Sequence, residues 1–236
     1  MKPHVLCHTA SSIDGRALLS RWQPRDCVAD GLFAQVYGEL GGEAWIVGRT
    51  TGEEYAKGLA YPDATDQTFP RESWFARGDA ACWAVILDPL GKIAWGRREI
   101  EGDPILVVLR EDVSDAHLAG LRAEGVSYLF AGRSELDLGL LLEKLGDLGV
   151  RLVRVEGGGV TNGAFLRAGL VDEISLLLFP AVDGASGGAS VFHSGPSEPD
   201  ARAPLRSIEL VSHRQLPGGA MWLRYRVTNG RPSDES

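Results

Sequence analysis

Residues 153–172 read VRVEGGGVTNGAFLRAGLVD, and this stretch decides the fold. A β-branched run that stops at Glu156 predicts a strand, the three glycines after it predict a tight turn, and residues 164–168 predict a short helix. Thr161 and Asn162 are candidate caps for that helix. Accessible backbone amides at a helix N-terminus suit a phosphate group. The alternative interpretation is a tight turn that binds nothing, because a glycine turn alone is a weak motif.

The chain on both sides of this stretch alternates apolar strands with amphipathic helices. The predicted strands cover residues 4–9, 44–47, 82–87, 105–109, 126–130, 151–155 and 174–182. The predicted helices cover residues 26–40, 53–57, 115–124 and 136–148. This alternation predicts an α/β fold with a mainly parallel central sheet and helices on both faces. Residues 205–213 and 220–227 flank a Pro-Gly-Gly turn and predict an antiparallel C-terminal hairpin.

No internal repeat or linker interrupts this pattern, so residues 1–228 are predicted to form a single domain. Residues 229–236, NGRPSDES, are polar and predict a disordered tail. Residues 58–79 have no clear period and predict a long surface loop or an irregular lid.

Charge and hydropathy exclude several partner classes. The 236 residues carry a formal net charge of −8, which argues against non-specific nucleic-acid binding. No apolar run approaches the roughly 20 residues that a membrane helix needs. The N-terminus, MKPHVLCHTASS, has neither the apolar core nor the cleavage pattern of a secretory signal. We therefore expect a cytoplasmic protein that acts on a small molecule.

The cysteines and histidines predict neither a disulfide scaffold nor a metal site. Cys7, Cys27 and Cys82 are scattered and form no CxxC pair, which is typical of a reduced intracellular protein. His4 and His8 are four residues apart, but they lie in a predicted strand, where this spacing does not build a helical metal site. The sequence implies no metal.

Three turns are candidates for a ligand site: residues 12–15, 48–51 and 156–161. In open α/β sheets, ligands bind at the carboxyl ends of the strands. The second and third turns each follow a strand and precede a helix, so we expect them to hold the two phosphates of a dinucleotide together. The chain has no ordered GxGxxG, P-loop or GxSxG pattern, which argues against Rossmann, P-loop and α/β-hydrolase sites.

Three patterns give the sequence a family resemblance. Residues 12–16, SIDGR, are similar to a family pattern S-L-D-G-R/K, and residues 48–51, GRTT, are similar to the G-R-x-T of dihydrofolate reductases. Residues 155–184 are similar to V-E-G-G-x-L-x-x-x-F-L-x-x-G-L-V-D-E followed by a strand. The chain, to about Val227, resembles the dihydrofolate reductase-like fold, specifically the riboflavin biosynthesis reductase (RibD C-terminal domain-like) family.

The resemblance implies a reductase that uses NADPH and assigns the cofactor-binding residues. These are Gly48, Arg49, Thr50 and Thr51 at the phosphates, and Gly157, Gly158, Gly159, Val160 and Thr161 beside the pyrophosphate and nicotinamide. Arg49 falls where dihydrofolate reductases place a basic residue near the 2′-phosphate, which favours NADPH over NADH. The alternative is a surface arginine that pairs with Glu53 or Glu54.

The resemblance also assigns a substrate side. Asp14 and Glu156 are the catalytic candidates, able to orient a substrate amine or hydroxyl or to assist proton delivery. Ser12 and His8 are the substrate-binding candidates, and His8 stands where the family usually has lysine. Each carboxylate also has a structural alternative, Asp14 as a turn former and Glu156 as an acceptor for nearby amides.

The chain departs from the family after the second turn. The family carries T-V-x-x-D-D-P-x-L there, whereas residues 51–56 read TGEEYA. The extra acids would repel a phosphorylated ligand, which argues against the usual substrate. The resemblance thus implies an NADPH-dependent oxidoreductase for a small heterocycle, such as a 5-amino-6-ribosylamino-pyrimidine phosphate. The alternative is a non-catalytic nucleotide-binding protein that retains the fold.

Relatives with this fold form pairs of subunits, so the resemblance also implies a homodimer.

Overall fold

The computed structural model describes residues 1–195 and 202–230. The chain divides into two compact units. Unit 1 comprises Met1–Pro3 and Gly42–Val153, and unit 2 comprises His4–Gly41 and Arg154–Ser236. The prediction of one domain over residues 1–228 stays a prediction, and residues 231–236 of the predicted tail lie outside the described residues.

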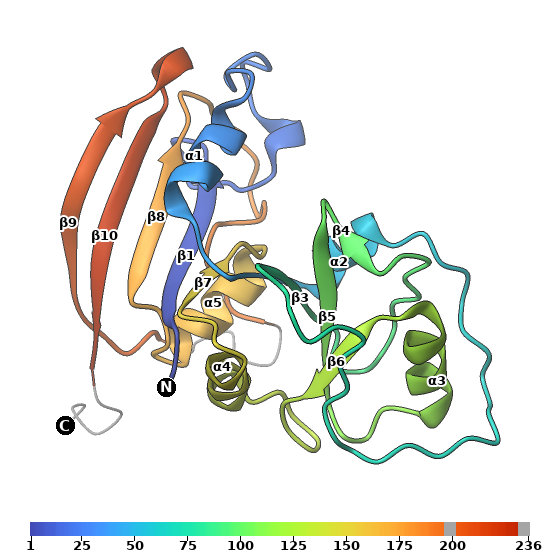
Figure 1. Cartoon of the computed structure of the whole chain (residues 1–236). Helices are drawn as coiled ribbons and strands as arrows, with labels where there is room; N and C mark the ends of the chain where they lie inside the picture. Colours follow the sequence, from blue (N-terminus) through green and yellow to red (C-terminus); the bar gives the residue numbers. More distant parts are fainter. Residues whose placement is uncertain (196–201, 231–236) are drawn as a thin grey trace. The chain divides into compact units, whose positions relative to one another are not determined.

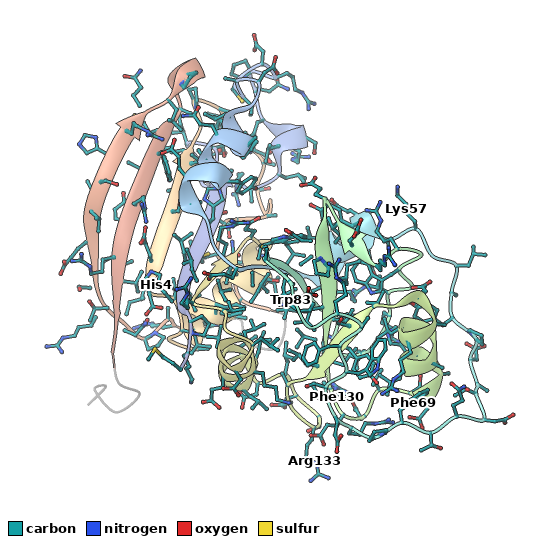
Figure 2. The ribbon with its side chains drawn as sticks, viewed as in Figure 1. His4, Lys57, Phe69, Trp83, Phe130 and Arg133 are labelled. Carbon is teal, nitrogen blue, oxygen red and sulfur yellow. The ribbon has the colours of Figure 1, made fainter. Side chains whose placement is uncertain are left out.

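Unit 1 contains four parallel strands. They are β2 (Ala44–Gly48), β3 (Trp83–Leu87), β5 (Asp103–Leu109) and β6 (Ser127–Phe130), in the order β6-β5-β3-β2, and Figure 1 labels β3, β5 and β6 of these. The short β4 (Glu99–Ile100) pairs with β5 in the antiparallel direction. Nearly every residue of the parallel strands is buried, including the labelled Trp83 and Phe130 (Figure 2). Such continuous apolar runs are typical of parallel strands covered on both faces.

The helices of unit 1 are α2 (Arg49–Tyr55), α3 (Asp115–Glu124) and α4 (Leu138–Asp147). Their ends follow from local chemistry. Ser114 Oγ accepts a hydrogen bond from the backbone amide of His117 at the start of α3, and Asp137 Oδ1 accepts from Leu140 at the start of α4. Gly125 ends α3 in the left-handed conformation. The predicted helix over residues 115–124 is confirmed at both ends.

Unit 2 is a four-stranded sheet with a mixed pairing pattern. Its order is β1 (His4–Ser11), β8 (Glu173–Leu178), β10 (Met221–Asn229) and β9 (Leu205–Gln215). β1 and β8 are parallel, and the last two strands are antiparallel, as Figure 1 shows. The predicted C-terminal hairpin and the α/β class are therefore confirmed. The helices of unit 2 are α1 (Leu32–Leu40) and α5 (Gly159–Arg167). The division of the chain into units falls within β7 (Leu152–Val155), between Val153 and Arg154.

Several predicted boundaries are wrong, among them those of the helix predicted over residues 53–57, which spans Arg49–Tyr55. The helix predicted from residue 26 begins only at Leu32, because Gly31 has a φ of 73°, which no right-handed helix can continue through. The strand predicted to residue 182 ends at Leu178, and Val182 pairs instead with Gln23 in an isolated bridge. β10 continues through Asn229, beyond the predicted start of the tail, and this side chain donates to the carbonyl of Val171 at 3.0 Å.

In the part of the chain that the structure describes, no helix combines the length and the hydropathy needed to span a membrane. The same residues contain no group of three or more His, Cys, Asp or Glu side chains placed to hold a metal ion.

Buried His117 makes the stability of the protein depend on pH. The ring is 7% exposed and packs against Tyr61, with ring centroids 5.1 Å apart. Burial, and then the charge of Lys92, lower the pKa of His117 from 6.5 to about 4. Between these values the unfolded chain binds more protons than the folded chain. The contribution of His117 is therefore complete above about pH 6.5 and is lost as the pH falls toward 4.

We expect His117→Gln to lose less stability on acidification than the parent protein. The difference should be at most about 3 kcal/mol, since one pKa unit corresponds to about 1.4 kcal/mol. Urea unfolding at neutral and at mildly acidic pH measures it. His213→Gln, on exposed strand β9, controls for the loss of a histidine. An identical pH dependence in the parent and in His117→Gln would contradict this account of the buried ring.

Candidate functional site

A cavity of about 300 Å³ opens in unit 2. It lies among β1, the segment after β1, α1 and the turn that follows β7. Its lining consists of His8, Thr9, Ala10, Ala17, Leu19, Phe33, Tyr37, Glu156, Gly157 and Gly158. The fold therefore brings His8, Glu156 and two of the predicted turn glycines together, although about 150 residues of sequence separate β1 from this turn. Ser12 and Asp14 are not part of this lining.

The glycine turn leads directly into α5. The helix begins at Gly159, and Gly158 is its N-cap residue, with φ −67° and ψ 171°. The expected caps Thr161 and Asn162 are wrong, because both residues already lie within the helix. Asn162 is buried, and its Nδ2 atom donates to the carbonyl of Val191 at 3.1 Å. Its side chain thus anchors the 190–193 segment rather than the helix end.

The three glycines of the turn have different surroundings. A Cβ on Gly157 would lie 2.5 Å from the side chain of Thr161. A Cβ on Gly159 would lie 2.1 Å from the carbonyl oxygen of Ser190. For Gly158, nothing in the described part of the chain lies within 4 Å of such a Cβ, and its φ of −67° suits any residue. The backbone of Gly158 is therefore open on this side, which leaves room for another molecule to approach it.

An ion pair beside the cavity holds Glu156. Arg154 and Glu156 are two residues apart on an extended segment and share a face. Arg154 Nε donates to Glu156 Oε1 at 2.6 Å, and the two side chains are only 12% and 15% exposed. The guanidinium also lies over the ring of Tyr37, 5.6 Å from its centroid, and donates to the carbonyl of Gly41. The carboxylate therefore has a defined position in the cavity wall.

His8 is a buried residue in the middle of β1. It is 5% exposed, its Nδ1 lies 3.0 Å from Ser175 Oγ, and its ring meets the edge of Tyr37 at 5.4 Å. Burial, followed by the charge of Arg154, lowers the pKa of His8 to about 4, against a smaller opposing effect of the Ser175 backbone. His8 is therefore neutral at physiological pH. It can offer one hydrogen-bond donor or acceptor to a ligand.

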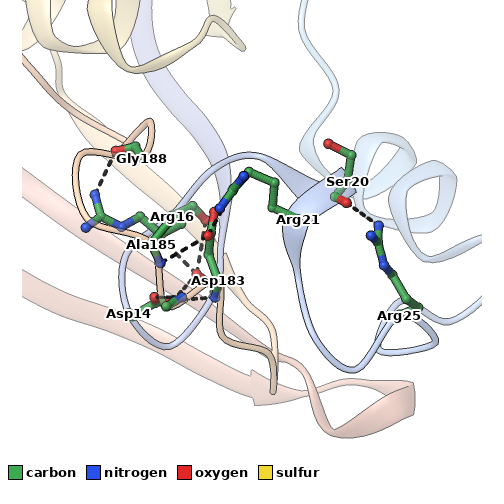
Figure 3. Close-up of polar contacts among 10 residues, drawn as sticks. Asp14, Arg16, Ser20, Arg21, Arg25, Asp183, Ala185 and Gly188 are labelled. Carbon is green, nitrogen blue, oxygen red and sulfur yellow. Dashed lines mark hydrogen bonds and ion pairs between the residues drawn. The ribbon is translucent and has the colours of Figure 1, made fainter.

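Asp14 makes the contacts expected of a turn former (Figure 3). Its carboxylate accepts hydrogen bonds from Ser12 Oγ at 2.6 Å, from Gly184 N at 2.8 Å and from Asp183 N at 3.2 Å. The bond from Ser12, followed by that from Gly184, lowers the pKa of Asp14 to about 2. These bonds tie the turn after β1 to the segment after β8, and Arg16 adds a bond to Gly188 O at 2.7 Å. A catalytic role for Asp14 stays a prediction.

The segment at residues 48–51 belongs to unit 1, and the prediction that it forms a turn before a helix is wrong: Gly48 is the N-cap of α2, and residues 49–51 are its first helical turn. Arg49 pairs with Glu53 one helical turn later, as the alternative interpretation expected, and both side chains are nearly half exposed. Such exposed pairs contribute only about 0.2–1 kcal/mol, so a phosphate can compete for the guanidinium. That this segment and the glycine turn hold one ligand stays a prediction.

Sequence reasoning missed four side chains of this site. Arg154 could have been found from strand periodicity, because it lies two residues before Glu156. Phe33 and Tyr37 are four apart in the predicted helix, which places them on one face. Ser175 had no sequence signal, because only strand register brings it beside His8.

Comparisons with known proteins found similar sequences and similar folds. Residues 3–221 match the family model described as RibD C-terminal domain. The chain is 33% identical over 101 residues to the 2,5-diamino-6-ribosylamino-4(3H)-pyrimidinone 5′-phosphate reductase of Methanothermobacter thermautotrophicus. That match covers 42% of this chain and 46% of the relative, about half the length of each.

Solved structures share the fold at low identity. A pyrimidine reductase-like protein from Corynebacterium diphtheriae has a TM-score of 0.69 and 19% identity, covering 96% of this chain and 92% of that one. RibD from Acinetobacter baumannii has a TM-score of 0.64 and 22% identity, covering 97% and 59%. The riboflavin biosynthesis reductase of Saccharomyces cerevisiae has a TM-score of 0.56 and 18% identity, covering 96% and 90%.

Proposed function

The chain belongs to the RibD C-terminal domain family, a reductase family that uses NAD(P)H, and we propose that it is an NADPH-dependent reductase of a small heterocycle. The observation that carries this proposal is Gly158, a glycine with open space above it at the rim of the cavity and at the N-terminus of α5. Amides at that position suit the diphosphate of a dinucleotide. The bound nicotinamide would supply the hydride.

The chain's own residues would position the substrate. Glu156, fixed by Arg154, offers a carboxylate acceptor, and neutral His8 offers a ring nitrogen. Phe33 and Tyr37 add aromatic surface for a planar ring, with centroids 6.4 Å apart in stacked orientation. The cavity lining contains no lysine or arginine among the described residues, which supports a heterocycle there; a phosphate group of the substrate would bind outside this lining.

The test of this function is turnover. Purified protein with NADPH should oxidise the cofactor in the presence of a pyrimidinone ribose phosphate such as the one in the name of the archaeal relative. Pterins, related aminopyrimidine ribose phosphates and quinones complete the panel. Nucleotide binding without oxidation across the whole panel would support the second candidate, a nucleotide-binding protein without catalysis. If neither NADPH nor NADH binds, both candidate functions fail.

Arg49→Ala should reduce the preference for NADPH over NADH. A ligand that binds only the folded state raises the thermal midpoint, and the shift grows with affinity. In the parent protein, we expect the larger shift with NADPH, and in Arg49→Ala we expect the two shifts to become similar. Arg151→Ala removes another exposed arginine that pairs with a glutamate, Glu43, and serves as the matched control. An unchanged preference in Arg49→Ala would remove this residue from the 2′-phosphate site.

A further inference from the structure

Ser175 connects the site to the interior of the sheet. Its hydroxyl lies 3.0 Å from His8 Nδ1 and 2.8 Å from Trp222 Nε1. The strand register explains the arrangement, because His8 and Ser175 are paired on β1 and β8. On the adjacent β10, Ser175 is paired with Arg224, and Trp222 lies two positions away, diagonal to Ser175 and on the same face. His8 and Trp222 are each 5% exposed and Ser175 is fully buried. These three side chains form a buried polar chain that ends at the cavity.

The positions of the polar hydrogen atoms among these three side chains follow from their donors and acceptors. The indole Nε1 of Trp222 is a donor only, so Ser175 Oγ accepts its hydrogen. Ser175 has one hydroxyl hydrogen, and a buried hydroxyl normally finds an acceptor. The side-chain atom within reach is Nδ1 of His8. A hydrogen on Nδ1 would make Ser175 accept twice and leave its own hydroxyl hydrogen without this partner.

We propose that Ser175, oriented by Trp222, donates to Nδ1 of His8 and thereby fixes the imidazole with its hydrogen on Nε2. Ser175 and Trp222 are positioning residues in this scheme, because neither lines the cavity. His8 then presents an uncharged N–H donor to the ligand. It selects a substrate with an acceptor at that point, such as a carbonyl oxygen or an unprotonated ring nitrogen. This consequence for substrates rests on the proposed function, whereas the tautomer itself does not.

Histidine tautomers are read directly by long-range proton–nitrogen NMR of the full chain labelled with ¹⁵N-histidine, with His8→Gln used to assign the signals. Near neutral pH we expect the His8 ring to carry hydrogen on Nε2. Ser175→Ala should shift the population toward the Nδ1 tautomer. Trp222→Phe keeps an aromatic ring and removes only the donor, so it should give a mixture even if Ser175→Ala folds poorly. Trp45→Phe, which removes the indole bond to Asp103 in unit 1, should leave the His8 signals unchanged.

Two results would overturn the inference: an Nδ1 hydrogen in the parent protein, directed at the Ser175 backbone, or an unchanged tautomer in both variants. Turnover adds a separate readout. Ser175→Ala should raise KM and lower kcat/KM by roughly tenfold or less, the effect of one weakened hydrogen bond, while NADPH binding is retained. If no substrate is turned over but the tautomer responds as expected, the proposed function fails and the role of Ser175 stands.

Discussion

Replacing Gly158 with alanine is expected to weaken NADPH binding by about tenfold or more, a loss of at least about 1.4 kcal/mol. The thermal midpoint of the ligand-free protein should stay unchanged. Alanine fits the backbone of Gly158, and its methyl group meets no atom of the described chain within 4 Å. The methyl group would instead occupy the space through which a diphosphate approaches the α5 amides. Calorimetric titration with NADPH and thermal unfolding measure the two effects separately.

Gly159→Ala is the matched control in the same turn. Its Cβ would lie 2.1 Å from the backbone oxygen of Ser190, which cannot move as a flexible side chain can. We expect this variant to lose about 1–3 kcal/mol of folding free energy through overpacking. Gly158→Ala should therefore affect mainly NADPH binding, whereas Gly159→Ala should affect mainly folding stability. Wild-type NADPH affinity in Gly158→Ala would mean that the open space above this glycine holds no cofactor.

Glu156→Gln is expected to lower kcat/KM by roughly 100-fold, the lower range for a group that assists proton transfer or binds charge in the transition state. Glutamine keeps the length and one oxygen acceptor but removes the charge that pairs with Arg154. NADPH affinity should be retained, because the substitution leaves the glycine turn intact. Steady-state kinetics with the substrate identified in the panel, together with nucleotide titration, make the measurement.

A second variant separates chemistry from the loss of the ion pair. Arg154 in Glu156→Gln keeps its charge in a position only 12% exposed, which we expect to cost about 1–2 kcal/mol of stability. Arg154→Met combined with Glu156→Gln removes both charges and should recover stability without recovering turnover. If the double variant regains activity, Glu156 acts only as a partner for Arg154. If Glu156→Gln is fully active, the carboxylate is dispensable.

Some site residues could be predicted from sequence because they are local to one turn. Residues 155–161 form strand, turn and helix start within seven positions, so their proximity follows from the chain itself. The helix start was placed too late. Thr161 and Asn162 are good cap residues, but the helix begins at Gly159, and Asn162 Nδ2 donates instead to the carbonyl of Val191. This contact, 29 residues away in the sequence, cannot be read from the local pattern.

The sequence alone determined the α/β class, the C-terminal hairpin and the family, because hydrophobic periodicity and turn residues are encoded locally. Only the tertiary structure decided which glycine has open space and which polar groups meet at the cavity. Gly157, Gly158 and Gly159 are the same residue in the sequence. A Cβ on Gly159 would meet Ser190, which comes from a distant segment, whereas a Cβ on Gly158 would meet no atom of the described chain within 4 Å. His8, Ser175 and Trp222 likewise meet only through strand register, which buries their hydrogen bonds away from water.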